Sequence, residues 1–91
     1  MKKGHIDYMQ VKAASEVMEE LRGRTMHMVW QYRAWRQRRA GELMQSTHLL
    51  MEDDLMQEQI RQMFALYRTT QREYHDLYRR SMAQLAKRKA A

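Results

Sequence analysis

The sequence contains no cysteine and no proline, and only three of its 91 residues are glycine. Without cysteine there is no disulfide bond. A structural zinc site is not expected either, because its ligands would have to come from four scattered histidines with no cysteine. No segment approaches the ~20 consecutive apolar residues that a membrane-spanning helix requires. We therefore expect a cytoplasmic protein without metal or cofactor, stabilised by helix packing or by oligomerisation.

The residues that are present are typical of long helices. Alanine, leucine, methionine, glutamate, glutamine, lysine and arginine dominate the chain, and all have high helix propensity. The turn signal is Gly41 followed by Gln45-Ser46-Thr47. We predict one all-α domain over residues 1–91, with a first helix at about 6–40, a turn at about 41–47, a second helix at about 48–88 and a basic tail at 87–91.

Each predicted helix carries a seam of residues spaced alternately by four and three positions, which is typical of a coiled-coil-like pair. The first seam comprises Ala14, Met18, Leu21, Thr25, Met28, Tyr32 and Trp35. The second comprises Met56, Ile60, Met63, Tyr67, Thr70, Tyr74 and Leu77, and is then expected to drift toward Tyr78, Met82 and Leu85.

One glycine and one capping signal refine the predicted helices. Gly23 lies off the first seam, which predicts a kink or a close backbone contact there. Ser46 or Thr47 is placed to cap the second helix, and the acids at 52–54 follow closely enough to favour its positive end.

Charge alternates in blocks along the chain. Residues 7–20 hold four acids and one lysine, residues 21–39 six arginines, residues 42–58 five acids, and residues 61–91 eight bases and two acids. Folding the chain near residue 44 sets each acidic block opposite a basic one, which favours an antiparallel two-helix hairpin over one continuous helix that dimerises along its length. The expected pairs are Glu20 with Arg68, Glu16 with Arg72, Asp7 with Arg79 and Arg80, and Arg33 and Arg36 with Asp54 and Glu52.

Two helices make a thin core, because each has only one neighbour. Apolar residues at 26–30 surround the first helix on all sides, so this segment needs more cover than one hairpin provides. We therefore predict a homodimer in which two hairpins form a four-helix bundle.

Catalytic and metal-binding patterns are missing from the sequence. The histidines at 5, 27, 48 and 75 never stand four residues apart, and the nearest metal pair is His48 with Glu52. There is no glycine-rich phosphate loop and no G-x-S-x-G nucleophile motif. We expect neither an enzyme nor a metal site.

The segment Trp30–Arg39 combines tryptophan with arginine, and these two residue types dominate protein-binding hot spots. Trp30 lies off the seam and needs cover that the hairpin does not provide. The methionines at 9, 26, 44 and 51 also lie off both seams, which favours an adaptable contact surface. The alternative is that the aromatic residues fill the seam and the arginines are solvated. The predicted partner-binding residues are Met26, Trp30, Arg33, Arg36, Arg38 and Arg39.

These observations predict a protein–protein interaction module, a regulator that docks on a larger protein as an adaptor, chaperone or inhibitor. The alternative is a basic helical nucleic-acid-binding protein, because the net charge is +6. Acids interspersed among the bases weaken this alternative and also weaken binding to a membrane surface. The expected nucleic-acid contacts are Arg79, Arg80, Lys87, Arg88 and Lys89.

Overall fold

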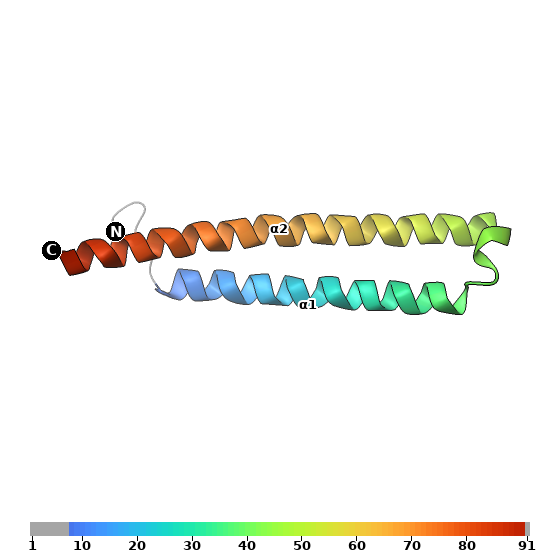
Figure 1. Cartoon of the computed structure of the whole chain (residues 1–91), viewed down its shortest axis with the longest axis horizontal. Coiled ribbons are helices and arrows are strands. Elements are labelled where there is room, and N and C mark those ends of the chain that lie inside the picture. Colours follow the sequence, from blue (N-terminus) through green and yellow to red (C-terminus); the bar gives the residue numbers. More distant parts are fainter. Residues whose placement is uncertain (1–7, 91) are drawn as a thin grey trace.

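The computed structural model describes residues 8–90, which form two long helices joined by a short turn (Figure 1). Helix α1 spans Tyr8–Arg38, a 3₁₀ turn, η1, spans Leu43–Gln45, and helix α2 spans Thr47–Ala90. The helices lie side by side and antiparallel, in a rod of 69 × 19 × 18 Å. The predicted all-α antiparallel hairpin is confirmed, and a single continuous helix through the turn is excluded.

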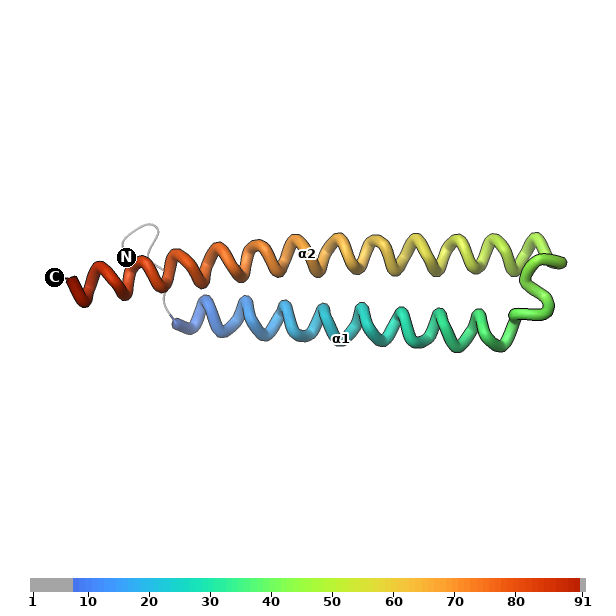
Figure 2. Tube along the Cα trace, in the orientation of Figure 1, coloured from blue at the N-terminus to red at the C-terminus, as the bar shows by residue number. Residues whose placement is uncertain are grey.

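The two helices differ in length. α1 has 31 residues and α2 has 44, so α2 continues past the beginning of α1, as the Cα trace shows (Figure 2). α1 ends at Arg38, two residues before the expected end at about 40, so the turn begins earlier than predicted. α2 begins at Thr47, one residue before the expected start at about 48.

The start of α2 is capped by Ser46. Its Oγ accepts a 3.3 Å hydrogen bond from the backbone N–H of Leu49, and its carbonyl accepts the N–H of Leu50. The prediction of a cap at Ser46 or Thr47 is thus confirmed at Ser46. The side chain of Leu43 turns inward beneath this connection and is 6% exposed.

The predicted seams form the contact between α1 and α2. All seven residues of the first seam are buried or half-buried, and so are the first seven of the second. The expected drift near the end of α2 is wrong, because Tyr78, Met82 and Leu85 are each nearly half exposed. Ser81 and Gln84, which continue the four-and-three spacing from Leu77, are half-buried instead.

Gly23 plays no special part in the backbone. α1 passes through it without interruption, and a Cβ placed there would meet no atom within 4 Å. The expected close contact is therefore wrong, and the helix does not break at this residue (Figure 2).

The ion pairs differ from the predicted ones. Within the range 8–90, every ion pair joins residues three or four positions apart, including Arg24 to Glu20 at 2.7 Å and Arg80 to Asp76 at 2.9 Å. Glu20 does not pair across to α2, because Arg24 one turn away on the same helix is its partner, and Glu16 makes no ion pair within residues 8–90. The expected pairing of Asp7 lies outside the described residues.

The core is thin. Leu43 is the one hydrophobic residue that is buried between residues 8 and 90. None of the helices in this part of the chain is long and apolar enough to cross a membrane.

Candidate protein-binding surface

A polar cluster joins the two helices near the turn. The hydroxyl of Tyr32 on α1 donates a 2.7 Å hydrogen bond to Oδ1 of Asp53 on α2. Nε2 of Gln57 donates to Oδ2 of Asp53 at 2.8 Å and to the Tyr32 hydroxyl at 3.0 Å. Asp53 is only 6% exposed, and these bonds compensate the burial of its carboxylate. The cluster sets the register of α1 against α2.

Asp53 therefore has a different role from the one expected. We predicted that the acids at 52–54 would stabilise the positive end of α2, but the first turn of α2 contains no acid. The carboxylate of Asp53 faces α1 instead. The expected pairs across the hairpin do not form: the Arg36 guanidinium donates to the Tyr32 hydroxyl at 3.0 Å and not to Glu52, and Arg33 makes no ion pair with Asp54.

A groove runs between the helices beside this cluster, with a volume of about 470 Å³. Its sides carry three guanidinium groups, those of Arg33 and Arg36 on α1 and of Arg61 on α2. Val29 and Ile60 line it as apolar side chains, together with an aromatic ring on α2. We call this the cationic groove; its residues are Val29, Tyr32, Arg33, Arg36, Gln57, Ile60, Arg61 and Phe64.

The groove on the other side of the seam has no charge. It is smaller, about 180 Å³, and is lined by Met28, Gln31, Tyr32, Met56, Gln59 and Ile60. The two grooves of the hairpin thus offer different chemistry, because only the first carries arginines and neither is lined by a carboxylate.

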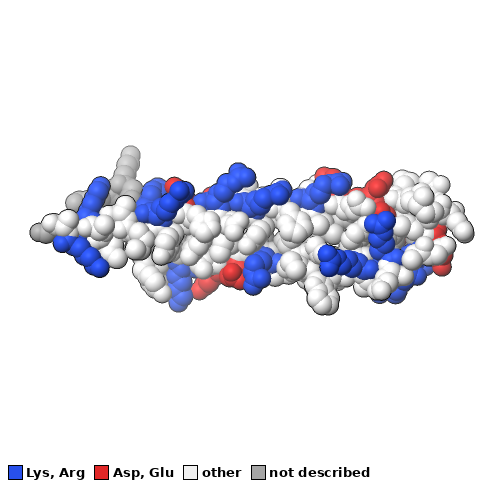
Figure 3. Space-filling view, viewed as in Figure 1, with Lys and Arg blue, Asp and Glu red and all other residues white. Residues whose placement is uncertain are grey.

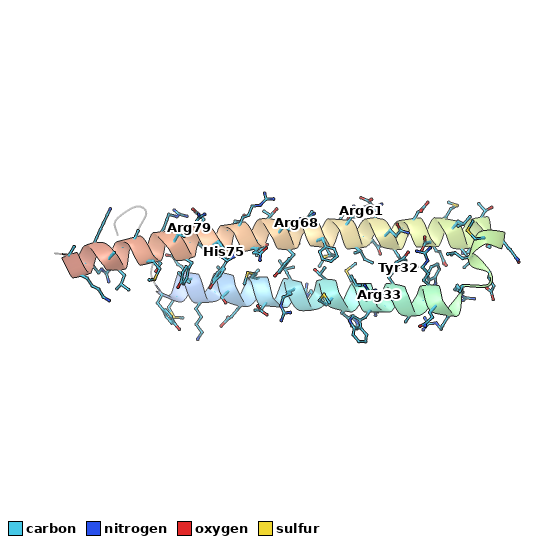
Figure 4. All side chains as sticks on the ribbon, viewed as in Figure 1. Tyr32, Arg33, Arg61, Arg68, His75 and Arg79 are labelled. Atoms are coloured by element: carbon cyan, nitrogen blue, oxygen red, sulfur yellow. The ribbon has the colours of Figure 1, made fainter. Side chains whose placement is uncertain are left out.

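Figure 4 places Arg33 on α1 and Arg61 on α2, with Tyr32 between the helices. On the face in Figure 3, basic side chains follow the outer edge of α2 and also cover α1 near the turn, with uncharged surface between them. On this face the positive charge therefore borders the uncharged surface on both sides.

Trp30 lies on the opposite side of α1 from α2. Successive residues of an α-helix are about 100° apart, so Trp30 is about 200° from both Met28 and Tyr32, which face α2. Its side chain is 70% exposed, and that of Met26, one turn away, is 46% exposed. With Arg33, three residues further along, these side chains form a continuous surface that we call the Trp30 patch.

The six predicted partner-binding residues therefore divide into groups. Arg33 belongs to both the Trp30 patch and the cationic groove, and Arg36 lies in the groove. Arg39 is paired with Glu42 at 3.3 Å in the turn. Arg38 lies outside both surfaces and makes no ion pair within residues 8–90. The structure does not gather all six into one site.

The four methionines expected off the seams are exposed, as predicted. Met9, Met44 and Met51 are 65%, 82% and 67% exposed, and Met26 is the fourth. They lie at different places along the hairpin, so only Met26 contributes to the Trp30 patch.

Basic residues of α2 form a row along one side of the helix. Arg68, Arg72 and Arg79 are spaced by four and seven positions, and none has an ion-pair partner in the described part of the chain. Arg61 extends this row toward the turn, as Figure 4 shows for Arg61, Arg68 and Arg79. Arg80, one of the expected nucleic-acid contacts, is paired with Asp76. The last turn of α2 carries the exposed bases Lys87, Arg88 and Lys89.

Sequence reasoning missed the α2 side of the cationic groove. Phe64 is 37% exposed and follows the seam residue Met63, and Arg61 follows Ile60 in the same way. The signal was available, because residues that directly follow a seam position lie on the flank of the helix, where a groove beside the contact begins.

The nearest metal pair expected from the sequence, His48 with Glu52, lies at the start of α2. Nε2 of His48 lies 3.5 Å from a carboxylate oxygen of Glu52, and both side chains are exposed. No group of three or more potential metal ligands lies together within residues 8–90.

Comparison with known proteins gave no relative: no family model, no curated protein and no solved structure matches the chain.

Proposed function

We propose that this helical hairpin is a non-enzymatic protein–protein interaction module that docks on a larger partner through one side of α1. The observation that carries the proposal is the Trp30 patch. A tryptophan that is 70% exposed, next to a half-exposed Met26 and to Arg33, which has no ion pair within residues 8–90, is the composition of a binding hot spot before its partner has bound. An adaptor, chaperone or inhibitor would use such a surface, and this regulatory role remains a prediction.

The exposed area of the hairpin supports the proposal. A compact protein of 11.2 kDa exposes about 5,700 Å². The chain exposes 7647 Å², an excess of roughly 2,000 Å². A stable protein interface buries about 800 Å² on each partner, so there is enough surplus surface for a partner and for a second copy.

A homodimer is part of the same proposal. The radius of gyration is 20.2 Å, against about 12 Å for a compact domain of this length. Two hairpins packed into a four-helix bundle would cover the exposed apolar side chains that one hairpin leaves in water. The uncharged groove at Met28 and Met56 suits a second copy. Its lining contains no arginine, so two copies can meet there without repulsion between like charges.

A pull-down from native cell extract tests the proposal. We expect tagged hairpin to retain a protein partner after nuclease treatment, and Trp30→Ala with Arg33→Ala to lose that protein while keeping its helicity. The matched control is Met44→Ala with Lys12→Ala, which removes an exposed apolar side chain and a base outside the patch. Equal retention by the two double variants would refute the Trp30 patch as the docking surface.

Nucleic-acid binding is the second candidate, and one observation favours it. We had expected acids of the opposite helix to neutralise most arginines, but the acids pair within their own helices and leave Arg68, Arg72 and Arg79 without an ion pair between residues 8 and 90. A row of free guanidinium groups is suited to a phosphate backbone. If this candidate is correct, nuclease treatment removes all bound material, and the Trp30 variant still binds.

A further inference from the structure

We propose that the cationic groove binds an acidic amphipathic helix of a partner protein, with the partner's apolar side chains against the groove and its carboxylates on the arginines. This inference rests on the proposed function and deepens it, because it states the chemistry of the partner. It concerns the side of the hairpin where α1 and α2 meet, beside the Tyr32–Asp53 hydrogen bond.

The charge of the groove is only partly compensated, because one of its three arginines, Arg61, has an ion-pair partner within the described chain. Arg33 makes no ion pair within the described chain, and Arg36 is bonded to the neutral hydroxyl of Tyr32. Arg61 is bonded to Glu58 at 2.8 Å, but both side chains are more than half exposed, so this pair contributes little and can be exchanged. No carboxylate lines the groove.

Three guanidinium groups on two facing helices favour a ligand with several carboxylates. An arginine presents its N–H groups as a planar fork that matches a carboxylate with two parallel hydrogen bonds. Arg33 and Arg61 come from different helices, so an acidic residue on either side of an inserted helix finds its own arginine (Figure 4).

The apolar lining selects a protein helix over a nucleic acid. Val29 and Ile60 are half-buried and the ring of Phe64 is 37% exposed, so the groove offers apolar surface between its arginines. A phosphate backbone has nothing to place there, whereas an amphipathic helix has an apolar stripe flanked by polar residues. The groove between α1 and α2 accepts a third helix at the usual separation of helix axes, about 8–10 Å.

A second copy of this chain is a weaker match for the groove. It carries the same three arginines and a net charge of +6, and four of its acids, Glu19, Glu20, Glu58 and Asp76, are already paired with arginines on their own helix. The acidic helix is therefore expected from a different protein.

Fluorescence anisotropy with two synthetic helical peptides tests the inference on the purified full chain. Both peptides carry the same leucine stripe, flanked by glutamate in one and by lysine in the other. We expect the glutamate peptide to bind at least about tenfold more tightly, with affinity falling as salt rises. Arg33→Glu with Arg61→Glu should reverse this preference, and the neutral Arg33→Gln with Arg61→Gln should weaken the glutamate peptide without gaining the lysine peptide.

The control is Lys12→Glu with Arg24→Glu, which changes the net charge equally but outside the groove. It should bind the glutamate peptide within about threefold of the parent chain, since distant exposed charges are screened. Circular dichroism establishes that each variant remains helical. Should a charge-reversed variant unfold, the neutral double variant decides the outcome.

Five outcomes would overturn the inference. Equal affinity for the two peptides would show that the groove does not select acidic helices. If the control variant lost as much affinity for the glutamate peptide as the groove variant, the binding would depend on overall charge alone. A labelled single-stranded RNA that binds more tightly than the glutamate peptide and depends on Arg33 and Arg61 would assign the groove to nucleic acid. A dimer that dissociates when these arginines are reversed would assign the groove to a second copy. If the peptides fail while the Trp30 variant still loses its partner, only the groove assignment is wrong.

Discussion

The hydroxyl of Tyr32 and the carboxylate of Asp53 form a 2.7 Å hydrogen bond that joins α1 to α2. Asp53 is the one acidic side chain that is buried within residues 8–90, and it accepts a second hydrogen bond from Gln57. Because the hydroxyl both donates to Asp53 and accepts from Gln57, loss of this one group unbalances the whole cluster.

Tyr32→Phe should therefore lower the free energy of unfolding by about 1–3 kcal/mol, because the carboxylate of Asp53 loses its partner on α1 while remaining buried. Urea unfolding followed by circular dichroism measures the loss. Tyr67→Phe is the matched control, since Tyr67 is also a half-buried seam tyrosine but its hydroxyl makes no hydrogen bond with residues 8–90. Equal losses in the two variants would show that the Tyr32 hydroxyl contributes nothing of its own.

The seams show how much of this fold can be predicted from sequence. The alternating spacing of four and three identified seven α1 residues from Ala14 to Trp35 that are all buried or half-buried, because burial on a helix must recur at the helical period. Extending the second seam backward from Met56 by the same steps reaches Asp53 and then Leu49, both of which face α1. We treated Asp53 as an acid of the helix start, and so missed it as a seam residue.

Ion pairs and the groove could not be predicted in the same way. Block charges indicate which segments face each other, but an exposed arginine takes whichever carboxylate is nearest, and for Arg24 that is Glu20 one turn away. The α2 side of the cationic groove depends on which flank of each helix meets the other, and this rotation is decided by packing around residues such as Tyr32 and Ile60.

Ser46→Ala should destabilise the hairpin by about 1 kcal/mol, because the Leu49 N–H loses its only capping acceptor at the start of α2. Thermal unfolding measures the change. Ser81→Ala serves as the comparison, since Ser81 lies within α2 and alanine has the higher helix propensity there. A Ser46 variant as stable as the Ser81 variant would show that the cap is not formed in solution.

Gly23→Ala should stabilise the protein by about 0.5–1 kcal/mol, because alanine is the better helix former and its Cβ would meet no atom within 4 Å. A Cβ at Gly41 would also meet no atom within 4 Å, but Gly41 lies in the turn, outside α1. We therefore expect Gly41→Ala to change the free energy of unfolding less than Gly23→Ala. Chemical unfolding of both variants gives the difference. Destabilisation by Gly23→Ala would indicate that a partner, such as a second copy, approaches the helix at this glycine.

Trp35→Ala and Trp30→Ala separate the core from the surface. Trp35 is half-buried on the seam and its ring stacks on Tyr32 with centroids 6.4 Å apart, so its truncation should cost about 3 kcal/mol, the lower end of the range for buried aromatic residues. Trp30 is 70% exposed, and its truncation should cost less than about 1 kcal/mol. Unfolding at low protein concentration measures both values. A large loss for Trp30 that grows with protein concentration would place this residue in the homodimer interface.

The predicted homodimer should have a mass near twice 11.2 kDa in sedimentation equilibrium. Leu43 is the one hydrophobic residue of the described chain that is buried, so association should supply a large part of the apolar burial that stabilises the helices. Because a second copy binds only the folded state, the unfolding midpoint should rise with protein concentration.

Met28→Glu with Met56→Glu introduces like charges into the uncharged groove and should shift the protein toward the monomer. The control, Met44→Glu with Met51→Glu, changes exposed methionines elsewhere and should leave the dimer intact. A monomer whose cooperative unfolding is independent of concentration would refute the dimer, and the excess exposed surface would then be available to other proteins alone.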